Sequence, residues 1–117
     1  MQKFSNERNK LNDNNRQITY RGEKIIEILQ EINYILCSLH DMSSYYLEQD
    51  TREYEKETTQ FIDNSLVCNR LALIRRVLTE QFDLKEGDDG LDDVERACED
   101  IMYWSKPGDY SNETWIK

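Results

Sequence analysis

Apolar residues recur every three or four positions along most of the chain, which is the period of an α-helix with one buried face. Over residues 21–48 they predict one helix about 40 Å long, at a rise of 1.5 Å per residue. Its stripe consists of Ile25, Ile28, Leu29, Ile32, Ile35, Leu36, Leu39, Met42 and Tyr46. Ile26, Tyr34, Cys37 and Tyr45 lie towards another side, so we expect this helix to contact more than one neighbour.

A second helix is predicted over residues 52–82. Asp50 offers an N-cap acceptor and Glu53 follows three positions later, a variant of the capping box. Apolar residues are sparse in the first half of this helix, but residues 66–78 are apolar on nearly every side. We expect that second half to be the most buried segment of the protein.

A third helix is predicted over residues 91–104, after a turn at Asp88-Asp89-Gly90. Two long helices joined by a short turn pack antiparallel. The sequence therefore predicts an all-α fold, a long antiparallel helical hairpin with a shorter third helix in a small helical bundle. The third helix covers one end of the hairpin. The other end, from Tyr45 to Phe61, needs the chain termini or a second copy to cover it.

The 117 residues suit one domain with its own core. We expect a flexible N-terminal arm at 1–18, which is rich in Asn and poor in apolar side chains, a helical bundle domain at 19–105, and a C-terminal aromatic tail at 106–117. No apolar run suits a signal peptide or a membrane span. Three cysteines without a CxxC pair indicate reduced thiols, so we expect a cytoplasmic protein.

The negative charge of the chain is concentrated in one segment. Residues 80–100 hold ten carboxylates against Lys85 and Arg96, a net −8 in a chain of net −9. A field of one sign over a small surface speeds encounters with a basic partner and repels nucleic acid and anionic membrane. The candidate partner-binding residues are Asp83, Glu86, Asp88, Asp89, Asp92, Asp93, Glu95, Glu99 and Asp100. We expect Arg70, Arg75 and Arg76 to pair with carboxylates of the third helix, such as Glu95 or Glu99.

The sequence offers few candidate metal-ligating or catalytic residues. Cys37, His40, Cys68 and Cys98 could make a tetrahedral zinc site, but Cys68 and Cys98 fall on apolar faces where free cysteine acts as a small hydrophobe. A Cys–His nucleophile pair lacks any oxyanion feature, and a single histidine excludes a di-iron bundle. An EF-hand calcium loop needs glycine at position six. Placing Gly87 or Gly90 there puts Phe82 or Lys85 at position one, and neither side chain can bind calcium. We expect no catalytic residue, no metal and no cofactor.

A small, acidic, all-helical chain without catalytic residues is typical of a stoichiometric inhibitor. In size, charge and helicity it is similar to bacterial immunity proteins, which carry carboxylates to the basic site of a toxin nuclease, although no motif here is diagnostic. We therefore expect a basic protein partner, no direct nucleic acid and no membrane. The alternatives are a phage anti-defence protein that mimics nucleic-acid charge and a dimeric helical adaptor, and a homodimer stays open.

Overall fold

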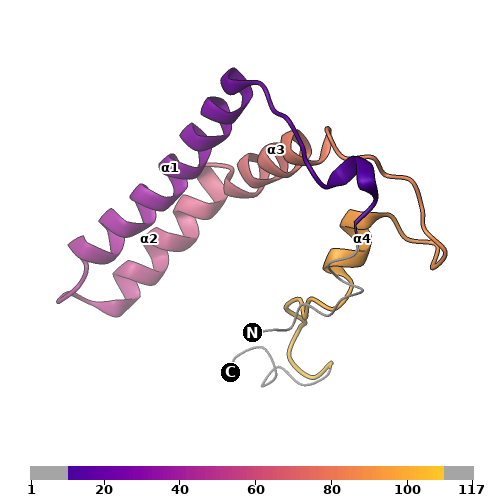
Figure 1. The fold of residues 1–117 in the computed structure, drawn as a ribbon. Coiled ribbons are helices and arrows are strands. Elements are labelled where there is room, and N and C mark those ends of the chain that lie inside the picture. Colours follow the sequence, from indigo (N-terminus) through magenta and orange to yellow (C-terminus); the bar gives the residue numbers. More distant parts are fainter. Residues whose placement is uncertain (1–10, 110–117) are drawn as a thin grey trace. The chain divides into compact units, whose positions relative to one another are not determined.

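The computed structural model describes residues 11–109, and every regular element in that range is helical, which confirms the predicted fold class. The elements are η1 (Asp13–Asn15), α1 (Gly22–Tyr45), α2 (Thr51–Asn64), α3 (Val67–Thr79) and α4 (Asp93–Cys98) (Figure 1). The chain forms two compact units. Residues 18–82 are here called the hairpin unit, and residues 11–17 with 83–109 the acidic unit.

The hairpin unit is an antiparallel pair extended by a third helix. α1 runs against α2, the two being joined by residues 46–50, and α3 packs on α1 (Figure 1). Asp50 caps α2 as predicted, because its side chain accepts a hydrogen bond from the amide of Arg52. Three mutually packed helices agree with a small bundle.

The single helix predicted over 52–82 is wrong, because the chain breaks at Ser65 and Leu66. Ser65 ends α2, and Leu66 takes a left-handed conformation with φ 55° and ψ 46° before α3 begins. The preceding run Asp63-Asn64-Ser65 explains the break, since short polar side chains compete for backbone hydrogen bonds and favour helix ends. The hydrophobic period continues across the break and so conceals it.

Arg70 connects the break between α2 and α3 to α1, so the predicted pairing of Arg70 with the third helix is wrong. Its Nε donates to the carbonyl of Ser65 at 2.8 Å, and its Nη1 lies 2.7 Å from Glu31 Oε1. The guanidinium also lies over the Tyr34 ring, 4.2 Å from the centroid. Arg76 pairs within the hairpin unit too, with Glu80 one turn away.

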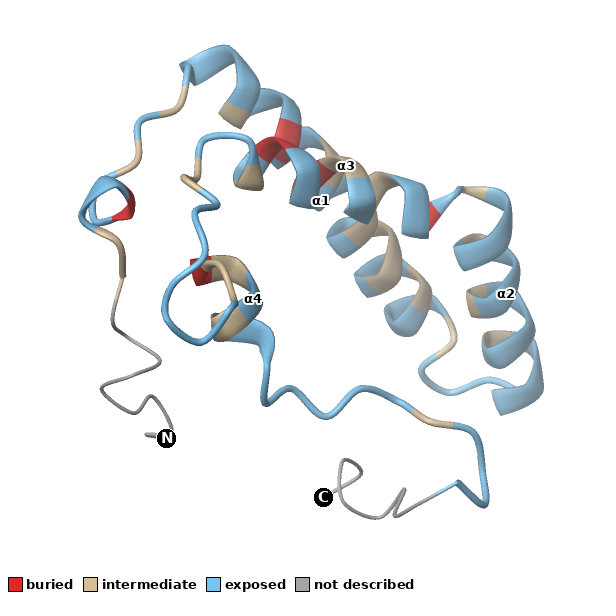
Figure 2. Cartoon of the chain, turned by 90° about the vertical axis from the view of Figure 1, so that its right-hand side faces the viewer, coloured by how far each residue is buried: buried red, intermediate tan, exposed pale blue. Residues whose placement is uncertain are grey.

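The core of the hairpin unit is small. Ile28 of α1 packs with Ile74 and Val77 of α3 in one buried cluster, and Val67 is buried separately (Figure 2). Three of the four buried apolar residues thus belong to the segment predicted to be most buried. The same segment nevertheless exposes Leu66, Leu71 and Leu78, so an apolar sequence does not make it buried on every side.

The third helix is shorter than predicted, covering 93–98 instead of 91–104. Glu99 and Asp100 place negative charge at its carboxyl end, where the helix dipole disfavours it. Of the following residues, Ile101 is β-branched and Tyr103 and Trp104 are aromatic, and these three have modest helix propensity. The burial inferred for Cys68 and Cys98 is also wrong, since all three cysteines are exposed.

The predicted domain boundaries stay predictions. Of the N-terminal arm only residues 11–18 are described, and of the aromatic tail only 106–109; Tyr110, Trp115 and Ile116 lie outside the described residues. At the hairpin tip Tyr45 is exposed, while Tyr46 packs between Tyr45 and Tyr54, with ring centroids 4.8 and 6.2 Å away. Phe61, at the other limit of this end, packs against Tyr34 of α1 with ring centroids 5.7 Å apart.

Leu66 provides the first test. A non-glycine residue in the left-handed region costs about 1–2 kcal/mol, and Asn tolerates that region better than Leu. Because the Leu66 side chain is 58% exposed, its removal loses little packing. We expect Leu66→Asn to raise the free energy of unfolding by about 0.5–1 kcal/mol and Leu66→Val to lower it, both measured by urea denaturation. A destabilised Asn variant would contradict the assigned conformation.

Candidate functional site

The acidic unit is built around a capped helix. Asp92 is the N-cap of α4 and accepts a hydrogen bond from the Glu95 amide at 2.8 Å. The Glu95 carboxylate in turn accepts from the Asp92 amide at 3.0 Å, which completes a reciprocal capping box. Two of the candidate carboxylates therefore serve to start this helix.

Arg96 joins α4 to the turn that precedes it. Its Nε and Nη2 donate to the two carboxylate oxygens of Asp89, at 2.7 and 2.9 Å, in a bidentate pair. Its Nη1 donates to Asp93 at 2.8 Å and its Nη2 also to the Leu91 carbonyl at 2.8 Å. Only 17% of the Arg96 side chain is exposed, so the cation lies inside a shell of acceptors.

Gly87 leaves room for this arrangement. A Cβ at Gly87 would lie 2.8 Å from Arg96 Nη2, closer than real contacts allow. The Gly87 amide donates to the Leu91 carbonyl at 2.9 Å, which closes the loop over the guanidinium. Gly90 takes a left-handed φ of 80°, a conformation that glycine adopts more readily than other residues do. The loop and the arginine therefore depend on each other.

Asp93 connects the two stretches of chain that form the acidic unit. It is 6% exposed, and its Oδ2 accepts from the Asn12 amide and from Asn15 Nδ2, both at 2.8 Å. Asn15 is 3% exposed and also pairs with the Asp83 backbone, donating to its carbonyl at 2.9 Å and accepting from its amide at 2.7 Å. Sequence reasoning missed these two asparagines, because their signal is only an Asn-rich run.

Hydrogen bonding holds three carboxylates in the charged form. The Arg96 guanidinium holds the pKa of Asp89 well below its usual range, and the Asn15 side-chain donor is the main cause of a lowered pKa at Asp93. The Asn14 side chain does the same for Asp83, to which it donates at 2.8 Å. Asp89 and Asp93 together raise the pKa of Arg96.

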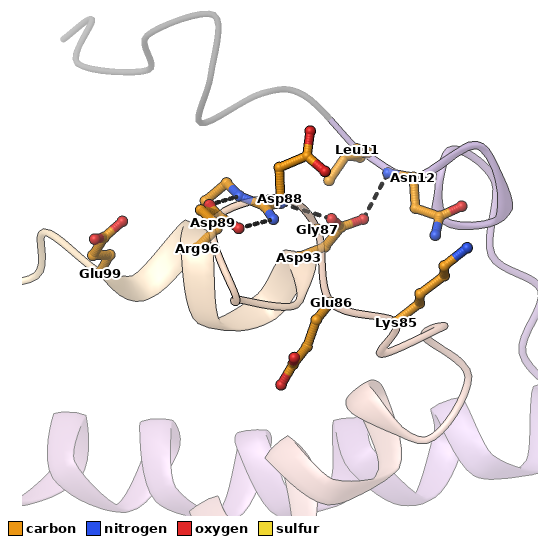
Figure 3. Close-up of a pocket in the computed structure, with 10 residues that line it drawn as sticks. All are labelled: Leu11, Asn12, Lys85, Glu86, Gly87, Asp88, Asp89, Asp93, Arg96 and Glu99. Carbon is orange, nitrogen blue, oxygen red and sulfur yellow. Dashed lines mark hydrogen bonds and ion pairs between the residues drawn. The ribbon is translucent and has the colours of Figure 1, made fainter.

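Three further acidic side chains line an open hollow of about 760 Å³ beside this network (Figure 3). Glu86, Asp88 and Glu99 line it and are exposed. Within residues 11–109 the carboxylates of these three make no hydrogen bond or ion pair. Figure 3 shows the Glu86 side chain pointing away from the Arg96 cluster, and Glu99 standing apart from it.

The nine candidate residues thus divide by role. Five have carboxylates bonded inside the acidic unit, namely Asp83, Asp89, Asp92, Asp93 and Glu95. Three are exposed around the hollow, namely Glu86, Asp88 and Glu99, and Asp100 is exposed just after α4. The structure brings the candidates together in one unit, but five of the nine carboxylates hold that unit in shape.

No group of three or more His, Cys, Asp or Glu side chains in the described range could hold a metal ion. None of the helices described is both long and apolar enough to cross a membrane. Comparison with protein-family models, with curated proteins and with solved structures finds no match to this chain.

The buried network can be tested at Asp93. Asn cannot present two acceptor atoms, so either orientation of its amide faces a donor at Asn12 and Asn15 or at Arg96. A buried group left unsatisfied costs about 1–3 kcal/mol. We expect Asp93→Asn to lower hydrogen-exchange protection of the Asp83 amide by at least about ten-fold. The exposed Asp88→Asn is the matched control and should leave that protection unchanged, whereas equal effects would contradict the network.

The same network predicts an acid transition. Asp83, Asp89 and Asp93 have folded-state pKa values below that of an unfolded Asp, about 3.9. Their contribution to stability is therefore complete above about pH 4 and is lost as pH falls through the folded-state values. We expect the NMR signals of the Asn15 side-chain amide to begin moving towards unfolded positions once the pH falls below about 4, and to move further as Asp83, Asp89 and Asp93 become protonated. Signals that have not moved at about pH 1 would contradict this expectation.

Proposed function

We propose that the protein binds a basic protein partner through the acidic unit and that it acts as an inhibitor, with a nuclease toxin as the partner. The observation that carries the proposal is the set of exposed carboxylates around the hollow, those of Glu86, Asp88 and Glu99, which make no hydrogen bond or ion pair within residues 11–109. They stand on a loop and helix whose inner carboxylates are already neutralised by Arg96 and by backbone donors. The inner carboxylates stabilise the conformation of the acidic unit, and the outer carboxylates are available to contact a partner.

Charge density supports a basic partner. The described part of the acidic unit has eleven carboxylates and four cations, a net −7 of the chain's −9. A local field of that size accelerates association with a positively charged surface and opposes binding to nucleic acid. The active site of a nuclease is such a surface, because it must hold phosphates.

Preorganisation supports tight binding. Ordering loops and side chains at an interface costs affinity, and a surface that is already ordered avoids that cost. The loop before α4 is fixed at both ends, by the Asp83–Asn15 contacts and by the Arg96–Asp89 pair. Glu86 and Asp88 lie between these two anchors and so project from a fixed backbone.

The position of Glu99 is also poorly explained by folding alone. Glu99 follows the last residue of α4, where a cation would stabilise the helix and an acid does not. Residues that break a local rule without a compensating contact are often found at functional sites. This placement favours recognition over simple solubility.

The proposal predicts the effect of a triple neutralisation, Glu86→Gln, Asp88→Asn and Glu99→Gln. None of these side chains contributes a hydrogen bond to the fold in the described range, so the fold should persist. The matched control is Glu27→Gln, Glu48→Gln and Glu55→Gln, which removes the same charge from exposed positions of the hairpin unit and its turn. We expect the first variant to lose at least about ten-fold in affinity for the partner, and the control to stay within about three-fold.

The measurement starts from the immobilised protein and a lysate of its natural host, with the captured protein identified, purified and assayed for nuclease activity. Association should slow steeply as salt rises from about 0.1 M to 1 M, because the Debye length falls from about 10 Å to 3 Å. A captured partner without nuclease activity overturns the inhibitor assignment. A partner that binds the two variants equally well overturns the acidic site itself.

A further inference from the structure

One face of α1 is apolar, uncharged and exposed. Leu29, Ile32 and Leu36 are 46%, 37% and 61% exposed, although they belong to the apolar stripe of the helix. With Ile25 before them and Leu39 after them they are spaced by four, three, four and three residues. That alternation is the heptad spacing of a helix seam that packs against another helix.

The face extends beyond the seam. On a helical wheel drawn at 100° per residue, the arc between the directions of Ile32 and Cys37 covers roughly 140° of the helix surface. The side chains beside the seam on that arc include Ile26, Asn33 and His40, none of which is a carboxylate, a lysine or an arginine. All formal charges of α1 lie on the opposite part of the helix, at Glu23, Lys24, Glu27, Glu31 and Asp41. In a chain that is one-third charged, this segregation marks a surface suited to burial.

α3 enlarges the same face. The Arg70 contacts with Glu31 and Tyr34 fix one side of the α1–α3 contact. Because the two helices run antiparallel, the seam of α1 emerges on the other side, next to the flank of α3 that carries Leu71 and Leu78. Those two residues are 50% and 38% exposed and are seven positions apart, on one stripe of α3.

We propose that this face, formed by Ile25, Leu29, Ile32, Leu36, Leu71 and Leu78, is the contact surface of a symmetric dimer, in which α1 of one copy packs against α1 of the other. Half-exposed side chains of this kind offer on the order of a few hundred Å² of apolar area per copy. A standard stable interface buries about 800 Å² per partner, a little more than half of it apolar. The face therefore provides most of the apolar area that such a dimer requires.

A second copy fits this face better than another part of the same chain. A heptad seam needs a helical partner of similar length, and α4 has only six residues. Residues 101–104 are apolar but form no helix. α1, with 24 residues, is the longest helix described, and its seam is complementary to itself because it carries no charge that would repel a copy.

This dimer concerns the hairpin unit and does not depend on the proposed function. The experiment is sedimentation equilibrium of the full chain from about 1 to 100 μM. We expect twice the 14.1 kDa chain mass in the upper part of that range, with no weakening when salt is added, because the contact is apolar. Salt dependence separates this contact from binding through the acidic unit.

The variants locate the contact. Leu29→Glu with Leu36→Glu should raise the dimer dissociation constant at least about 100-fold while the helical circular dichroism is retained. Leu66→Glu is the matched control, because Leu66 is 58% exposed and lies outside the seam, and it should change the constant less than about three-fold. If the double variant does not fold, Leu36→Gln alone should raise the constant at least about ten-fold.

Two results overturn the proposal. A parent protein that sediments as a monomer at about 100 μM shows that the face is bare or covered by the chain's own residues. A dimer that the seam variants weaken no more than Leu66→Glu does shows that the contact lies on another surface.

Discussion

The acidic unit depends on one half-buried cation, Arg96. Without Arg96, Asp89 and Asp93 would lie near each other as uncompensated charges, and like charges at close range repel. With it, both are held in charged hydrogen bonds, and the Leu91 carbonyl is fixed by the same guanidinium. Its planar group reaches these acceptors in different directions at once, which a lysine ammonium at the same place could not do. The loop, α4 and residues 12–15 are arranged around that geometry.

A second arginine performs a comparable task in the hairpin unit. Arg70 bridges Glu31 and the Ser65 carbonyl and stacks on Tyr34, so it closes the gap where the helix is interrupted. Both units have few buried apolar residues, and a small hydrophobic core leaves a larger share of specificity to polar contacts. In each unit a half-buried guanidinium replaces part of the missing core.

The sequence predicted the helical class, α1 and the capped start of α2 because these follow from periodicity and local capping. It failed at Ser65-Leu66, where the apolar period runs on through a left-handed residue and so conceals the end of one helix and the start of the next. It located the acidic candidates but could not separate their roles. Asp93 and Asp88 have the same chemistry, but Asp93 is held by Arg96 and by the distant partners Asn12 and Asn15, whereas Asp88 is exposed.

The two exposed surfaces have opposite physical character, and this has a consequence for stability. The outer carboxylates repel one another, so the acidic unit gains when a cationic surface approaches and neutralises them. The face on α1 and α3 gains when water leaves it. Any partner that binds only the folded form adds its binding free energy to the stability of that form, by linkage. In a protein with so small a core, association can therefore add substantially to the stability of the folded form. The two surfaces would associate under different conditions: low salt favours the acidic contact, whereas added salt does not oppose the apolar one.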